Sequence, residues 1–192
     1  MKIIYISTFL FSLIIASDLD DWLKEKSLLI NDQEFSIRFN YSVKEKNSNS
    51  YNINQGYGEY YFINSDSSII KLDNRITLCY GKNWEVIDID SKQKFLQGKD
   101  KILQEYIDRL LSIFFTDDYK VIKLIHDNYI LSLNDYFFIM SINFNSKEND
   151  VSKISFNQNS YLIEITNLSI SLLDSIPYQY QNWENFDTFN LR

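Results

Sequence analysis

The residues of this chain that could perform acid–base or nucleophilic chemistry are few and scattered. His126 is the only histidine and Cys79 is the only cysteine. A nucleophile or general base needs a partner side chain within hydrogen-bond distance, and nothing in the spacing of the sequence brings these two together. Cys79 lies in a predicted apolar strand, where a thiol is typically buried and unreactive. His126 lies at the end of a predicted strand, where a lone histidine is more often structural than catalytic.

Carboxylates form the other group of candidate catalytic residues. They occur as pairs at Asp20-Asp21, Asp88 with Asp90, and Asp117-Asp118. Each pair lies at a predicted helix start or turn, where acidic residues cap backbone N–H groups and stay solvated. The sequence contains no Gly-rich phosphate loop, no GxSxG or HExxH motif, and no clustered metal ligands. We therefore expect no enzymatic activity, no metal and no cofactor.

Aromatic residues are the notable feature of the composition, with 14 Phe, 14 Tyr and 3 Trp. Most of them must simply pack the core. The functional interpretation is that some line one face of a sheet for an apolar guest, because a site for acyl chains needs a large apolar area and few polar anchors.

The first residues are typical of a secretory leader. Lys2 precedes an apolar run, Ile3–Ile15, and the small residues Ala16 and Ser17 follow. The run is shorter than the about 20 residues that a membrane span needs. We therefore expect residues 1–17 to be a cleaved signal peptide and residues 18–192 to form a single domain; an uncleaved N-terminal anchor is the alternative.

The negative net charge of the chain disfavours some classes of binding partner. The chain carries 19 Lys and Arg against 26 Asp and Glu, a net charge of -7. A field of this sign disfavours nucleic acids and anionic membrane surfaces. We expect no nucleic-acid partner.

Periodicity predicts the first elements of the mature chain. Apolar residues recur at helical spacing from Leu19 to Ile30, with Asp18 as a candidate cap, so we expect an amphipathic helix there. Residues 34–43 alternate strictly, which predicts a strand with one buried face. The buried positions of that strand are Phe35, Ile37, Phe39, Tyr41 and Val43. Residues 44–55 are polar and predict a loop.

The rest of the chain predicts two runs of short strands separated by a helix. The first run is a meander over residues 58–96, an amphipathic helix follows at 98–115, and five strands follow over residues 119–172. An aromatic tail occupies residues 174–192. We expect an α+β, mainly β fold: a curved antiparallel sheet, or incomplete barrel, of about eleven strands, with the helices covering its concave face.

The order of these elements resembles the periplasmic outer-membrane lipoprotein carrier family, LolA. The resemblance rests mainly on the Gly58–Phe62 strand, followed by the hydrophobic strand, Gly-Lys turn and Trp strand of Ile76–Asp88. Phe35–Tyr41 is similar to the first strand of that family, and Ile176-Pro177 and Trp183 are placed like its C-terminal segment.

The chain also departs from the family pattern. Typical members carry an Arg-Pro pair after the Gly-x-aromatic strand, and that Arg is thought to hold a helical lid closed. Here Asn64-Ser65 occupies the place, and Arg75 lies on a neighbouring turn. The Asp of the family's Asp-Gly-Lys turn is Tyr80 here. A lid held closed by that Arg is therefore in doubt.

The resemblance implies a monomeric periplasmic carrier of lipoprotein acyl chains. Such a carrier receives its cargo from an inner-membrane ABC transporter and hands it to an outer-membrane receptor. We expect its hydrophobic cavity to be lined by side chains from the first strand, the meander and the helices: Phe35, Ile37, Phe39, Tyr41, Tyr60, Phe62, Trp84, Val86, Trp22, Leu110 and Phe114. The alternatives are a periplasmic module of similar fold that senses lipids or lipoproteins, and an exported hydrolase.

Overall fold

A computed structural model describes residues 18–31, 33–45, 53–115, 119–125, 127–133, 138–158, 160–178 and 183–192. The predicted signal peptide, His126 and the Asp117-Asp118 pair lie outside these ranges. Residues 18–30 form the N-terminal helix, as expected. The other elements are β1 (Phe35–Glu45), β2 (Ile53–Asn64), β3 (Ser67–Leu72), β4 (Arg75–Tyr80), β5 (Asn83–Asp88), β6 (Gln93–Gly98), α2 (Lys101–Phe115), β7 (Tyr119–Ile125), β8 (Asn128–Leu133), β9 (Phe138–Asn145), β10 (Asp150–Gln158), β11 (Tyr161–Leu172) and β12 (Asp187–Asn190).

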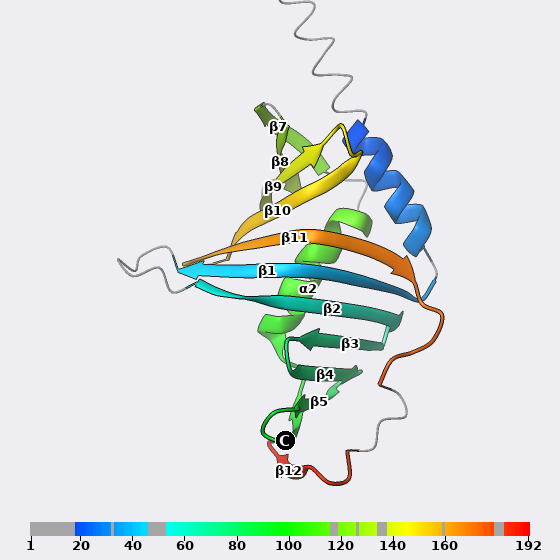
Figure 1. Cartoon of the computed structure of the whole chain (residues 1–192), viewed down its shortest axis with the longest axis vertical. Coiled ribbons are helices and arrows are strands. Elements are labelled where there is room, and N and C mark those ends of the chain that lie inside the picture. The colour runs from blue at the N-terminus through cyan, green and yellow to red at the C-terminus, as the bar shows by residue number, and fades with distance from the viewer. Residues whose placement is uncertain are drawn as a thin grey trace, which may run out of the picture. The chain divides into compact units, whose positions relative to one another are not determined.

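The described strands form one open sheet. Its order is β12-β6-β5-β4-β3-β2-β1-β11-β10-β9-β8-β7, so that β12 and β7 are the edges (Figure 1). The hairpins pair antiparallel, whereas β12 pairs parallel to β6. The predicted fold class, a mainly β α+β fold built on an open antiparallel sheet with helices, is confirmed. The eleven predicted strands are present, and β12 is a twelfth that the sequence analysis did not predict.

The predicted loop at residues 44–55 is wrong at both of its ends. β1 continues to Glu45 and β2 begins at Ile53. Polar side chains do not prevent strand formation where the backbone can join a ladder, so pairing extends both strands beyond their apolar stretches. Among the described residues, no helix is long and apolar enough to cross a membrane.

The chain packs as two compact units. The first contains Met1–Leu28, Ser42–Asn54 and Leu111–Leu168, and the second contains Leu29–Tyr41, Gln55–Leu110 and Ser169–Arg192. The division passes through the N-terminal helix, β1, β2, α2 and β11.

The first unit buries one face of β8, β9 and β10 beside the N-terminal helix. Trp22 of the helix lies with its ring centroid 6.0 Å from that of Phe114 near the end of α2. Its Nε1 donates a hydrogen bond to Asp150 Oδ1 at the start of β10, 3.1 Å away. The buried strand residues of this core recur at every second position, and they include Tyr129, Leu131, Met140, Ile142, Phe144 and Ile154.

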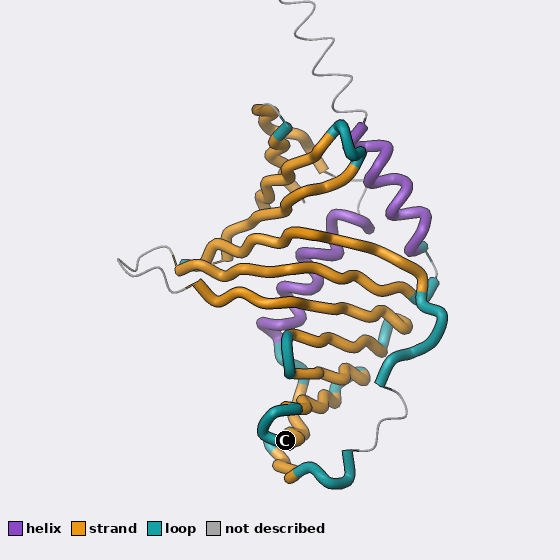
Figure 2. The backbone as a smooth tube through the Cα atoms, viewed as in Figure 1, coloured by secondary structure: helices purple, strands orange, loops and turns teal. Residues whose placement is uncertain are grey.

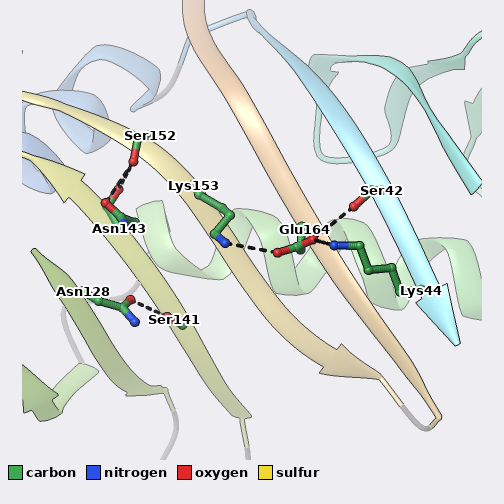
Figure 3. A network of polar contacts seen from close by, with 8 residues as sticks. All are labelled: Ser42, Lys44, Asn128, Ser141, Asn143, Ser152, Lys153 and Glu164. Carbon is green, nitrogen blue, oxygen red and sulfur yellow. Dashed lines mark hydrogen bonds and ion pairs between the residues drawn. The ribbon is translucent and has the colours of Figure 1, made fainter. Parts of the chain in front are cut away.

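Polar side chains cross the strands on the other face of the first unit (Figure 3). Glu164 of β11 accepts hydrogen bonds from Lys44 of β1 and from Lys153 of β10, the latter at 3.1 Å. The Lys44 ammonium holds the pKa of this carboxyl below its ordinary value. Asn143 accepts a bond from Ser152 at 3.0 Å. This face is therefore solvated, as the alternation of apolar and polar residues predicts.

The second unit covers one face of the meander with the C-terminal segment. Side chains of β2 to β5 on this face form an apolar cluster of Tyr61, Ile69, Ile76, Leu78 and Ile87. Residues after β11 pack on it, chiefly Ile176, Tyr178, Trp183 and Phe186. Figure 2 shows the described parts of this segment, residues 173–178 and 183–186, as loop. Phe189 of β12 then stacks on Phe95 of β6, with 5.4 Å between the ring centroids.

Candidate functional site

A pocket of about 800 Å³ lies in the first unit, between the N-terminal helix, the last turn of α2 and β7. A volume of this size is within the range of small-molecule sites. Its lining combines apolar and polar side chains: Asp20, Leu23, Lys24, Ser27, Leu28, Ile113, Phe114, Tyr119 and Val121.

The helix contributes one continuous side to the pocket. Its lining residues are at positions 20, 23, 24, 27 and 28, the i, i+3, i+4, i+7, i+8 spacing of a single helical face. Leu23 belongs to the buried stripe that holds the helix on the sheet, whereas Leu28 is 74% exposed. The apolar surface of the helix is therefore wider than its core contact requires, and Leu28 lies at the mouth of the pocket.

The other walls come from α2 and β7. Ile113 and Phe114 are buried at the end of α2 and supply the apolar floor. Tyr119 and Val121 alternate along β7, so both point to the same side of the strand. The Tyr119 hydroxyl donates a hydrogen bond to the Asp20 carboxylate, which links β7 to the helix. Val121 is 41% exposed and lies, like Leu28, at the opening.

This arrangement suits an amphiphilic guest. Five of the lining side chains are apolar and can bury a hydrocarbon chain: Leu23, Leu28, Ile113, Phe114 and Val121. The Tyr119–Asp20 pair, Lys24 and Ser27 supply the polar atoms of the lining, which can bond to a head group.

The predicted cavity residues of β1 and β2 pack against one another. The ring of Phe35 stacks on that of Phe62, with 5.0 Å between centroids, and is 6.3 Å from that of Tyr60. A Cβ at Gly58 would come within 2.5 Å of the Phe39 ring, so Phe39 lies directly over this glycine. Ile37 is fully buried. These side chains share one face of the sheet, as the alternation predicts, and much of their surface is covered by each other.

The remaining predicted strand residues are Trp84, Val86 and Tyr41. Trp84 and Val86 lie on the same face of the sheet as Tyr60, and Tyr41 lies near the end of β1. Strand register places Val86 in line with Tyr60 through β3 and β4, and places Trp84, which is buried, opposite Cys79. Burial raises the pKa of Tyr60, and Asp108 of α2 adds to this effect, so this part of α2 lies beside the face. Tyr41 instead donates a 2.7 Å hydrogen bond to Asp73. That these strand residues line a cavity for a guest stays a prediction.

Three predicted cavity residues come from the helices. Phe114 lines the pocket, and Trp22 packs against Phe114 without being one of the lining residues. Leu110 is buried one turn earlier in α2. The structure thus brings one predicted residue into the pocket and a second into contact with it.

Cys79, Asp88 and Asp90, which were candidates for catalysis, are buried in the core or hydrogen-bonded within turns. Burial raises the pKa of the Cys79 thiol to about 12, so it is protonated at neutral pH. The Ser91 N–H, 3.1 Å from Asp88 Oδ1, lowers the pKa of that carboxyl, and Asn74 donates a 2.8 Å bond to Asp90. Within the described part of the chain, no three His, Cys, Asp or Glu side chains are grouped to hold a metal ion.

Most of the pocket could not be predicted from the sequence. Asp20 was considered only as one of a pair of carboxylates, and Lys24, Ser27, Leu28 and Tyr119 were assigned to no site, because these residues meet only when the helix lies beside β7. One local signal was available: Leu28 is a large apolar residue that lies off the stripe formed by Leu19, Trp22 and Leu23.

No protein-family model matches the sequence, and no curated protein sequence matches it. Solved structures give matches at low identity. A LolA superfamily protein from Nitrosomonas europaea is 11% identical, with a TM-score of 0.43, over 85% of this chain and 97% of that chain. An uncharacterized conserved protein from Thermus thermophilus is 8% identical, with a TM-score of 0.46, over 91% and 98%. A putative outer membrane lipoprotein-sorting protein domain from Vibrio parahaemolyticus is 7% identical, with a TM-score of 0.37, over 82% and 93%.

All three TM-scores are below 0.5, so we infer no activity, ligand or partner from these similarities.

Proposed function

We propose that this protein is an exported carrier that binds acyl chains of lipoproteins non-covalently and performs no catalysis. The observation that carries the proposal is the pocket of about 800 Å³ beside the N-terminal helix. Burial of an acyl chain contributes about 0.8 kcal/mol per methylene, so an apolar pocket with a polar rim is sufficient for binding without covalent chemistry.

The exposed apolar side chains at the opening support reversible loading. Leu28 and Val121 present apolar surface to solvent in the absence of a guest. Large apolar residues in such positions are typical of a surface that an apolar partner covers. An acyl chain can enter between them without first unfolding the buried stripe of Leu19 and Trp22.

The finer parts of the proposal come from the sequence resemblance. It implies a periplasmic protein, with an inner-membrane ABC transporter as donor and an outer-membrane receptor as acceptor. The leader-like residues 1–17 are consistent with export.

A binding experiment with palmitate tests the pocket. We expect purified protein to bind a fluorescent palmitate analogue and to release it when unlabelled palmitate is added. The substitution Leu28→Glu should weaken binding about tenfold, because it replaces apolar contact with a charge at the opening. Leu191→Glu is the matched control, since Leu191 is 62% exposed and is not part of the pocket. An equal loss of palmitate affinity in both variants, or no palmitate binding by the wild-type protein, would contradict the proposal.

A transfer experiment separates carrying from sensing. Donor vesicles containing an acylated peptide are mixed with acceptor vesicles, and the protein should speed transfer in proportion to its concentration. A protein that binds palmitate but leaves the transfer rate unchanged would fit the sensing module instead.

A further inference from the structure

The strand that forms one wall of the pocket is also an edge of the sheet. β7 is the terminal strand in the strand order, and its Tyr119 and Val121 line the pocket. At the other end of the order, β12 pairs with β6. We propose, on the basis of the acyl-binding function above, that the cargo is an acylated polypeptide whose extended acidic segment pairs with the edge of β7 while its acyl chain occupies the pocket.

Continuity between pocket and edge is the first support for this proposal. Two residues of the same seven-residue strand contribute to the pocket wall. A chain that is anchored by its acyl group among Val121, Leu28 and Phe114 therefore leaves the pocket beside β7. An exposed sheet edge is a general site for an added peptide strand, in which main-chain hydrogen bonds supply affinity.

An irregularity in the pairing of β7 with β8 provides a position at which the edge can be altered selectively. Val121 is opposite Leu131 and Lys123 is opposite Ile130, so Ile122 has no register partner on β8. Ile122 is 45% exposed. A substitution at this position can therefore change the edge without removing a β7–β8 register pair or a pocket-lining side chain.

The positive charges near β7 favour an acidic peptide. β7 carries Lys120, which is exposed, and its sequence has no acidic residue, although the whole chain has a net charge of -7. Lys24 adds a further cation at the pocket. Lysines on edge strands commonly prevent aggregation, and the same charges discriminate between peptides because they attract an acidic strand and repel a basic one.

The test compares four probes on the purified protein: palmitate, an N-palmitoylated acidic octapeptide, the same peptide without palmitate, and an N-palmitoylated basic octapeptide. We expect the palmitoylated acidic peptide to bind about tenfold more tightly than palmitate, because strand pairing adds about 1.4 kcal/mol. Hydrogen exchange should slow at backbone amides of residues 119–125 with this peptide beyond any slowing that palmitate alone causes.

Variants of the edge complete the experiment. Ile122→Pro should reduce binding of the palmitoylated acidic peptide to the level of palmitate, while palmitate binding is unchanged; Ile122→Val is the conservative control. Lys120→Glu should reverse the preference between acidic and basic peptides. If palmitate binds but the peptide adds no affinity and no protection, the inference is overturned and the acyl-binding function stands. If palmitate does not bind, both are overturned.

Discussion

Cys79 illustrates how burial decides the chemistry of a single residue. Its pKa of about 12 follows mainly from desolvation by burial. Since the thiolate is the reactive form, the native protein should resist iodoacetamide at pH 8. Mass spectrometry should show one carbamidomethyl group only after denaturation in urea. Rapid labelling of the folded protein would contradict this prediction and would mean that Cys79 is a reactive thiol.

Glu164 gives a pH-dependent contribution to stability. The pKa of this carboxyl is lowered from its ordinary value of 4.5, first by the hydrogen bond from Lys44 and also by Lys153. A carboxyl with a lowered pKa in the folded state stabilises the protein above the unfolded-state pKa, and this contribution is lost as pH falls through the folded-state pKa. We therefore expect Glu164→Gln to destabilise the protein at pH 7 and to make little difference at pH 2.

Urea unfolding at both pH values measures this change in the free energy of unfolding. Glu148→Gln is the matched control, because Glu148 is exposed in the turn between β9 and β10. A loss of stability in Glu164→Gln that is the same at pH 7 and pH 2 would show that the side chain acts by packing and not by its charge.

The C-terminal segment is held by apolar packing at the scale of an element. Trp183 packs on the apolar cluster of β2 to β5 defined above, and its ring lies edge-on to that of Phe186 with 5.2 Å between centroids. We expect Trp183→Ala to lower the free energy of unfolding by about 2 kcal/mol, because a large partly buried ring is removed. Urea unfolding followed by circular dichroism measures this effect.

Trp183→Phe distinguishes packing from hydrogen bonding. Among the described residues, the buried Nε1 of Trp183 has no acceptor, so Phe should cost less than half as much as Ala. A cost for Phe equal to that for Ala would mean that the N–H has a partner and that packing is not the main contribution.

Local patterns predict an element well when turn residues bound it on both sides. β4 and β7 lie within the strand runs predicted at residues 58–96 and 119–172, and each is bounded where Asp73-Asn74, Gly81 or Asp127 interrupts the apolar periodicity. β12 was missed because all four of its residues are exposed and its partner β6 lies far away in the sequence. Its existence depends on a tertiary pairing that no local period encodes.

The candidate site was less predictable than the fold for the same reason. Alternation in β1 correctly grouped Phe35, Ile37 and Phe39 on one buried face. Alternation does not show whether other side chains of the protein cover such a face. Here Phe62 stacks on Phe35, and Gly58 lies against the Phe39 ring. The pocket depends instead on how the helix meets β7, which is a long-range juxtaposition.

A guest in the pocket should stabilise the folded molecule as a whole. A ligand that binds only the folded state adds about 2.7 kcal/mol to the free energy of unfolding at 100 times its dissociation constant. Palmitate should therefore raise the midpoint of thermal unfolding, and the shift should grow with palmitate concentration. Differential scanning calorimetry measures both quantities.

The same experiment on two variants shows where the stabilisation arises. In Leu28→Glu the shift should require about ten times more palmitate, whereas in Leu191→Glu it should match the wild type, since only the first substitution alters the opening of the pocket. Because Leu28 is 74% exposed, its substitution should leave the unfolding midpoint without palmitate nearly unchanged. A shift that is identical in all three proteins would mean that palmitate binds elsewhere, and the pocket beside the N-terminal helix would lose its assigned role.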